Sequence, residues 1–145
     1  MIDHVSISVR DLKAGARFYK TVLMPLGYLK LREEALTVGF GKKYPELWLN
    51  ARPKMQDDPE SGAHVCLRAR DQAAVDAFHA AAIAAGGRSD GEPGLRSHYH
   101  ETYYAAFIRD PDGNRVEAVT FLSSNPPERG RVASRKAASR VGSLL

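Results

Sequence analysis

The sequence has a single cysteine, Cys66, among its 145 residues. One cysteine excludes an internal disulfide framework and is typical of a reducing compartment. No stretch approaches the roughly 18 consecutive apolar residues that a membrane-spanning helix needs. The N-terminus does not read as a signal peptide either, because Asp3 and His4 interrupt it at once. We therefore expect a cytoplasmic protein that has no membrane partner.

The folded part of the chain has no excess of either charge. The formal net charge is +4, yet residues 1–122 carry 16 basic and 16 acidic side chains, so the excess lies in residues 123–145. That segment is rich in serine, alanine, glycine and proline, a composition typical of a disordered tail. A nucleic-acid partner would call for a basic patch on the folded part. Because residues 1–122 carry equal numbers of basic and acidic side chains, we expect no nucleic-acid partner.

A repeat with an offset of 60 residues organises the rest of the sequence. His4 and His64 each open a strand pattern, and an aspartate suited to cap a helix follows seven residues later. The same offset relates Asp11 to Asp71, Ala14 to Ala74, Phe18 to Phe78 and Gly27 to Gly87. The repeat predicts one domain built from two modules, at about residues 1–55 and 60–122.

Each module reads as one strand, one amphipathic helix and further strands. The first helix is expected at about residues 11–24, and the second begins at Asp71 and stops at Gly86. Further candidate strands cover residues 28–34, 36–40, 46–50, 102–109 and 114–121. The tetrapeptide 110–113, Asp-Pro-Asp-Gly, predicts a tight turn between the last two. Residues 88–102 read as a long loop with a short strand, so the order is β-α-β-β-β twice in an α+β fold.

One helix per module covers one face of its strands, so the other face should line a cleft or a partner surface. Strand alternation puts four residues on that face: His4, Glu46, His64 and Glu117. Two imidazoles and two carboxylates suit one borderline divalent cation, such as Zn, Ni, Fe, Mn or Co. Taken singly, each residue is more often solvated or structural. Their shared face and their placement, two in each module, favour a common metal site.

Other residues near this face are candidates for substrate contact. Trp48 and Asn50 share the face of Glu46, although Trp48 fits a packing role equally well. His98 and His100 lie in the 88–102 stretch close to Tyr103. They read either as ordinary loop residues or as part of a lid over the substrate.

These residues resemble the vicinal oxygen chelate superfamily, which includes glyoxalase I, extradiol dioxygenases and bleomycin- or fosfomycin-resistance proteins. The resemblance covers about residues 1–121. It rests on the two strand-opening histidines, Asp11-Leu12, Phe18-Tyr19, Glu46-Leu47 with Asn50, and the turn 110–113 leading to Val116-Glu117. It implies two βαβββ modules that form an incomplete β-barrel around a metal cleft, often in a homodimer. The resemblance leaves open whether the modules pair within one chain or across two.

The resemblance to glyoxalase I extends to single residues. His4, Glu46, His64 and Glu117 match its four metal ligands. In such an enzyme Glu117, or its mate Glu46, would move a proton between adjacent carbons of the substrate. Where glyoxalase I carries an arginine for the glutathione carboxylate, this sequence has Ser8, and Arg10 with the same parity is a candidate substitute.

Three functions are compatible with these residues. The first is a metal-dependent lyase or isomerase acting on a small substrate that chelates the metal through neighbouring oxygens. The second is an extradiol dioxygenase in which His4, His64 and Glu117 hold Fe(II). In that enzyme His98 or His100 would serve as the acid–base partner, and Glu46 would be a surplus ligand. The third is a resistance-type protein that sequesters a ligand without metal. The metal quartet favours the first.

Overall fold

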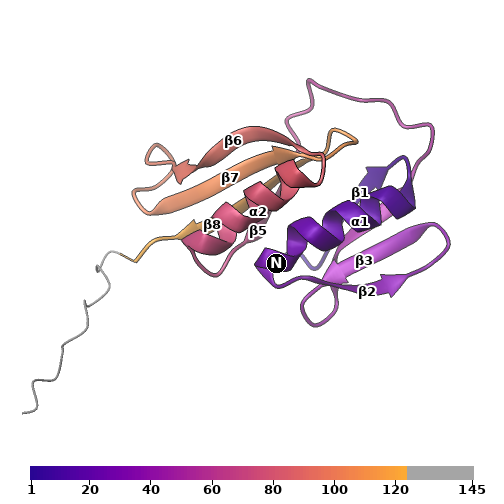
Figure 1. Cartoon of the computed structure of the whole chain (residues 1–145), viewed down its shortest axis with the longest axis horizontal. Helices are drawn as coiled ribbons and strands as arrows, with labels where there is room; N and C mark the ends of the chain where they lie inside the picture. Colours follow the sequence, from indigo (N-terminus) through magenta and orange to yellow (C-terminus); the bar gives the residue numbers. More distant parts are fainter. Residues whose placement is uncertain (124–145) are drawn as a thin grey trace, which may run out of the picture.

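The computed structural model describes residues 1–123 as an α+β fold in which two β-α-β-β-β units follow each other (Figure 1). The first contains β1 (Val5–Val9), α1 (Leu12–Leu23), the short 3-10 helix η1 (Met24–Leu26), β2 (Leu29–Glu33), β3 (Thr37–Gly41) and β4 (Pro45–Ala51). The second contains β5 (Val65–Arg68), α2 (Gln72–Ala84), β6 (Arg88–Leu95), β7 (Tyr103–Arg109) and β8 (Arg115–Phe121). The predicted fold class is confirmed. The predicted basic tail, residues 123–145, lies outside the described residues apart from Ser123.

Both helices begin directly after the aspartates that the repeat identified, which cap them. Asp11 Oδ1 accepts the amide hydrogen of Ala14 at 2.9 Å, and Asp71 Oδ1 accepts that of Ala74 at 2.8 Å. These bonds satisfy amides that have no partner within the first helical turn. The Ala14 amide also lowers the pKa of the Asp11 carboxyl. The modules therefore use the same device at the same place.

The strands form two four-stranded sheets, in the orders β1-β4-β3-β2 and β5-β8-β7-β6. In each sheet the first and last strands of the module run parallel, and the other pairs are antiparallel. Each helix packs on its own sheet, and the two modules lie side by side (Figure 1). Within residues 1–123 the sheets do not close into a barrel. Each sheet therefore keeps one face without a helix.

A single hydrophobic core joins the modules. Tyr19 and Leu47 of the first module and Phe78 and Val116 of the second belong to one buried cluster. The helices α1 and α2 also contact each other directly. Burial of these large apolar side chains removes apolar area from water, and that burial is what stabilises the contact between the modules.

Residues 88–102 are more regular than the long loop with a short strand that the sequence predicted. The strand β6 runs over eight residues and pairs with β7, although its register shifts between Ser89 and Gly91 and again between Gly91 and Gly94. These bulges, together with Pro93, hide the period-2 pattern on which the prediction depends. A proline is tolerated because β6 is the edge strand of its sheet.

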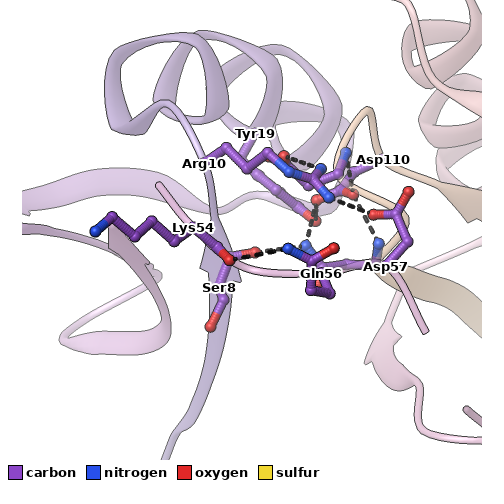
Figure 2. Close-up of polar contacts among 9 residues, drawn as sticks. Ser8, Arg10, Tyr19, Lys54, Gln56, Asp57 and Asp110 are labelled. Atoms are coloured by element: carbon purple, nitrogen blue, oxygen red, sulfur yellow. Dashed lines mark hydrogen bonds and ion pairs between the residues drawn. The ribbon is translucent and has the colours of Figure 1, made fainter. Parts of the chain in front are cut away.

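Polar contacts around the turn at 110–113 join the second module to the first (Figure 2). The Tyr19 hydroxyl on α1 donates to Asp110 Oδ2 at 2.7 Å. Asn114 Nδ2 donates to the carbonyl oxygen of Ser8 at 2.8 Å and also to Asp110 Oδ2. Burial raises the pKa of Asp110, while the bonds from Asn114 and Tyr19 oppose that rise. The turn thus ties the start of β8 to the end of β1.

Candidate functional site

Glu117 lies on the uncovered face of the second sheet. Its neighbours on β8, Val116 and Ala118, are buried in the core, so Glu117 projects from the opposite face. It is level with Cys66 on β5 and with Phe107 on β7. Although no helix covers this face, Glu117 is only 2% exposed. A carboxylate so well buried requires hydrogen-bond partners.

Two side chains contact the Glu117 carboxylate. His64 Nε2 lies 3.1 Å from Oε2, and the Tyr103 hydroxyl donates to Oε1 at 2.5 Å. His64 immediately precedes β5, and Tyr103 opens β7, so the fold brings three distant segments together. An imidazole nitrogen beside a carboxylate oxygen offers two of the donors that a divalent cation uses in proteins. We refer to His64 and Glu117 as the second half-site.

The surroundings of Glu117 raise the pKa values of Tyr103 and Cys66, so both side chains stay protonated. Burial, and then the hydrogen bond to Glu117, raises the pKa of Tyr103, so the phenol remains a donor. Cys66 Sγ lies 3.9 Å from that hydroxyl. Residue Cys66 is exposed overall, but desolvation of its thiol and the nearby Glu117 raise the thiol pKa to about 12. A thiol that stays protonated is a weak nucleophile.

In the first module His4 immediately precedes β1, and Glu46 is the second residue of β4. Val5 pairs with Leu47, so the residues just before them, His4 and Glu46, are level on the opposite face. His4 is more exposed than His64, and its Nδ1 lies 2.8 Å from the adjacent Asp3. Glu46 Oε2 accepts the Lys42 amide hydrogen at 3.1 Å. We refer to His4 and Glu46 as the first half-site.

The two half-sites lie on equivalent faces of their separate sheets but not at equivalent register positions. In the second module Glu117 pairs with Cys66, two residues beyond His64. The corresponding position of the first module pairs with Ser6 and is occupied by Trp48, not by Glu46. Glu46 thus stands two residues nearer the strand start than Glu117 does. The 60-residue repeat could not reveal this offset, because it compares first strands and helices only.

The four predicted ligands do not gather in one chain. Among residues 1–123, no three histidine, cysteine, aspartate or glutamate side chains come close enough to hold a metal ion together. The structure brings His64 and Glu117 into contact and puts His4 and Glu46 on neighbouring strands. Two donors are fewer than the three or four protein ligands of most zinc-type sites. A complete site therefore needs both half-sites.

Trp48 and Asn50 lie on the same face as Glu46, as the strand alternation predicted. Trp48 packs on Gly39, where a Cβ atom would stand 2.9 Å from the indole ring. Asn50 Oδ1 accepts the Thr37 hydroxyl hydrogen at 2.9 Å. Both side chains are partly exposed. Their contact with a substrate stays a prediction.

Arg10 lies at the junction between the modules. Its guanidinium donates to Asp57 at 2.5 Å and to Asp112 at 3.0 Å, and Figure 2 shows it beside Asp57. The Asp57 carboxylate contributes most to the raised pKa of Arg10. These ion pairs connect β1 to the linker after β4 and to the turn before β8. A substrate carboxylate would compete with both aspartates for this guanidinium.

Aromatic rings continue from Tyr103 to His98 and His100. Tyr99 packs edge-on against Tyr103 with ring centroids 5.4 Å apart, and His98 packs against Tyr99 at 4.2 Å. His100 lies 5.9 Å from the ring of Phe121. Both histidines are exposed. They belong to the rim of the surface that holds Glu117, and a role as lid or substrate contact stays a prediction.

A cavity of about 390 Å³ lies between the start of β1, the linker after β4 and the second sheet. His64 forms part of its wall, as do three arginines that the sequence analysis did not select: Arg88, Arg109 and Arg115. A signal for two of them was available. Arg109 directly precedes the turn at 110–113 and Arg115 follows it by two residues, so a hairpin there brings them close together, and they pair across β7 and β8.

Comparison with known proteins identifies the fold. The family model of the Glyoxalase/Bleomycin resistance protein/Dioxygenase superfamily matches residues 1–118. A glyoxalase/bleomycin resistance protein from Albidiferax ferrireducens is 30% identical, with a TM-score of 0.72 over 81% of this chain and 96% of that chain. A family enzyme from Burkholderia phytofirmans is 21% identical, with a TM-score of 0.67 over 83% and 98%. Fosfomycin resistance protein FosX from Mesorhizobium loti is 17% identical, with a TM-score of 0.62 over 84% and 92%.

The relatives at 21% and 17% identity show the fold alone. No curated protein matches the chain. Within residues 1–123, no helix combines the length and the apolar character needed to cross a membrane. The family model covers more than half of the chain, and both helices and all strands begin within it. The chain therefore belongs to the glyoxalase/bleomycin resistance protein/dioxygenase superfamily.

Proposed function

We propose that this protein is a divalent-metal-dependent lyase or isomerase whose small substrate chelates the metal through two neighbouring oxygens. The observation that carries the proposal is the contact between His64 and Glu117, 3.1 Å apart on the uncovered face. Family membership supports it, since the two residues match ligand positions of glyoxalase I. His4 and Glu46 supply a second pair of the same donor types.

The donor chemistry fits one divalent cation, provided that both half-sites take part. Neutral imidazole nitrogens and carboxylate oxygens suit Zn, Ni, Fe, Mn or Co, and the donor types alone do not select among them. Because no three such side chains converge within residues 1–123, we propose that the second half-site of one protomer faces the first half-site of its partner. A homodimer with two-fold symmetry contains two such sites.

The protein side chains have distinct roles in this proposal. A bound cation would supply Lewis acidity, stabilising negative charge on substrate oxygens. Glu117 Oε2 takes a proton from one carbon and returns it to the adjacent carbon. Tyr103 holds Oε1 through its hydroxyl, which leaves Oε2 as the atom directed toward His64. Glu46 is the alternative base, because it is the other carboxylate of the quartet.

Subunit complementation tests both the metal and the pairing. One variant carries His4→Ala with Glu46→Ala, and the other carries His64→Ala with Glu117→Ala. We expect each alone to bind no Ni²⁺ or Zn²⁺ in calorimetry. A purified heterodimer of the two should bind about half as much metal as the wild type, because one of its two sites is intact. A Tyr104→Phe variant is the control, since the Tyr104 hydroxyl donates to Asp76, away from the quartet.

Other outcomes contradict separate parts of the proposal. If the wild type binds metal but the heterodimer recovers none, the modules pair within one chain. If wild-type protein prepared without chelator contains no metal and gains none from added Ni²⁺ or Zn²⁺, the metal-dependent function is wrong. A ligand that then raised the Tm equally with and without chelator would identify a sequestering protein.

A further inference from the structure

Three arginines stand side by side across the second sheet. Arg88 on β6 pairs with Arg109 on β7, and Arg109 pairs with Arg115 on β8. Directly opposed residues in neighbouring strands point to the same face. His64, one residue before the Val65–Val116 pair, is level with Arg115. This arginine row, Arg88–Arg109–Arg115, therefore ends at the second half-site.

One carboxylate, that of Asp90, lies beside two of the three arginines. Asp90 Oδ1 accepts from Arg109 Nε at 3.1 Å, and its Oδ2 lies 3.5 Å from Arg115 Nε. Arg115 Nε is buried and has no hydrogen-bond partner among residues 1–123. Arg88 forms no ion pair with any described residue. Like charges placed directly opposite each other in a sheet are destabilising, so this row is under-compensated.

The row faces a space that can hold a ligand. All three arginines and His64 line the cavity of about 390 Å³ between the modules. Three aspartates line it too, but Asp57 and Asp112 are both bound to Arg10 on its first-module side. Only Asp58 remains there without an ion pair in the described part of the chain. The positive charge is thus concentrated on the wall formed by the second sheet.

The guanidinium edges are available to that space. Asp90 contacts Arg109 and Arg115 through their Nε atoms, and Arg115 Nη1 donates to the carbonyl oxygen of Ser61 at 2.9 Å. The remaining terminal N–H groups of both side chains make no hydrogen bond with residues 1–123. Paired N–H groups of a guanidinium match the two oxygens of a carboxylate or a phosphate.

We infer that the arginine row binds an oxyanion, a carboxylate or a phosphate group carried by the ligand. Arg109 and Arg115 hold the anion, and Arg88 adds charge from the exposed end of the row. Because the row ends beside His64, the rest of the ligand extends toward Glu117. If the proposed function holds, on which this last step rests, the substrate is a small anion with its chelating oxygens next to the charged group.

Calorimetric titration of metal-free wild-type protein with inorganic phosphate and with malonate, at constant ionic strength, tests the site. We expect one saturable anion per chain and an affinity lowered at least about tenfold by Arg109→Gln or Arg115→Gln, since each removes a charged donor pair. Arg88→Gln should weaken binding less. Asp90→Asn should strengthen it, because the competing carboxylate is gone. Preference for malonate or for phosphate assigns the anion class.

The matched control is Arg68→Gln. Arg68 lies on the same face of β5 but packs on the ring of Phe121, outside the row. The inference is wrong if wild-type protein shows no saturable anion binding, or if Arg68→Gln weakens binding as much as Arg115→Gln does. Thermal unfolding verifies that each variant is folded, and the exposed Arg88 gives a variant that leaves the core intact. Metal titration of the same proteins keeps failure of the metal site separate from failure of the anion site.

Discussion

In the first module the middle of the uncovered face holds Ser6, Trp48 and Gly39, level with one another across β1, β4 and β3. The corresponding row of the second module holds Cys66, Glu117 and Phe107. β8 is the counterpart of β4, and on it the carboxylate of Glu117 occupies the position that Trp48 occupies on β4. The aromatic ring of the second row, Phe107, lies instead on β7, the counterpart of β3. The same topology thus presents a neutral middle row in the first module and a middle row with a carboxylate in the second.

The faces under the helices show no such divergence. Phe18 and Phe78 occupy equivalent helix positions, and both are buried in the shared core. Close packing restricts the size and polarity of a core residue, whereas an uncovered face restricts mainly its parity. The comparison teaches that the repeat preserved what holds the modules together. It left the chemistry of the two faces free to differ.

Core substitutions should lower the free energy of unfolding the most, and by a similar amount in the two modules. Phe18→Ala and Phe78→Ala are each expected to lower the free energy of unfolding by about 3–5 kcal/mol, because each leaves a cavity in a close-packed core. Both variants should unfold in one cooperative transition, since a single cluster spans both modules. Urea denaturation followed by circular dichroism measures this. Two separate transitions would show that the modules are independent.

Removing each carboxylate in turn should show that the two half-sites contribute differently to metal affinity. Glu117→Ala is expected to lower metal affinity by about 100-fold or more, because it removes a ligand already fixed by two partners. Glu46→Ala should cost less, about tenfold, since its position is held only by the Lys42 amide. Calorimetric titration with Zn²⁺ measures both. Equal losses would mean that the two half-sites contribute alike despite the difference in register.

The Tyr103 hydroxyl offers a smaller test of preorganisation. Tyr103→Phe removes the donor to Glu117 Oε1 and is expected to lower metal affinity about tenfold, as the loss of a partner behind a ligand does. Tyr104→Phe is the matched control, because the Tyr104 hydroxyl donates to Asp76, away from Glu117. Unchanged metal affinity in Tyr103→Phe would show that the bond does not orient the carboxylate.

Local sequence patterns predicted those elements whose structure depends on residues close by in the sequence. The caps at Asp11 and Asp71, the turn at 110–113 and the core face of β4 depend on neighbouring residues, and each was predicted. A short strand was predicted within residues 88–102, but the full length of β6 was not, because its bulges and Pro93 break the alternation. Propensities at single positions carry no information about where an edge strand finds its pairing partner.

In the candidate site, too, local patterns were predictable and long-range pairing was not. Parity predicted that His64 and Glu117 share a face, and the structure brings them into contact. Register decides the two-residue offset between Glu46 and Glu117, and it depends on bulges such as the one at Gly41. The arginine row depends on cross-strand pairing over three strands, of which only the last hairpin was legible. Long-range pairing, unlike alternation, is set by the whole fold.

Removal of a helix cap should have the smallest effect on stability. For Asp11 that effect should depend on pH. Asp11→Ala and Asp71→Ala each remove an acceptor for a first-turn amide, so each should lower the Tm by a few degrees at neutral pH. The folded state lowers the pKa of Asp11. Its contribution is therefore present above the unfolded pKa of about 4 and is lost as pH falls through the lowered folded value. Thermal unfolding of wild type and Asp11→Ala should give converging Tm values toward about pH 2. A difference that persisted there would show that the neutral side chain, not the carboxylate, stabilises the helix.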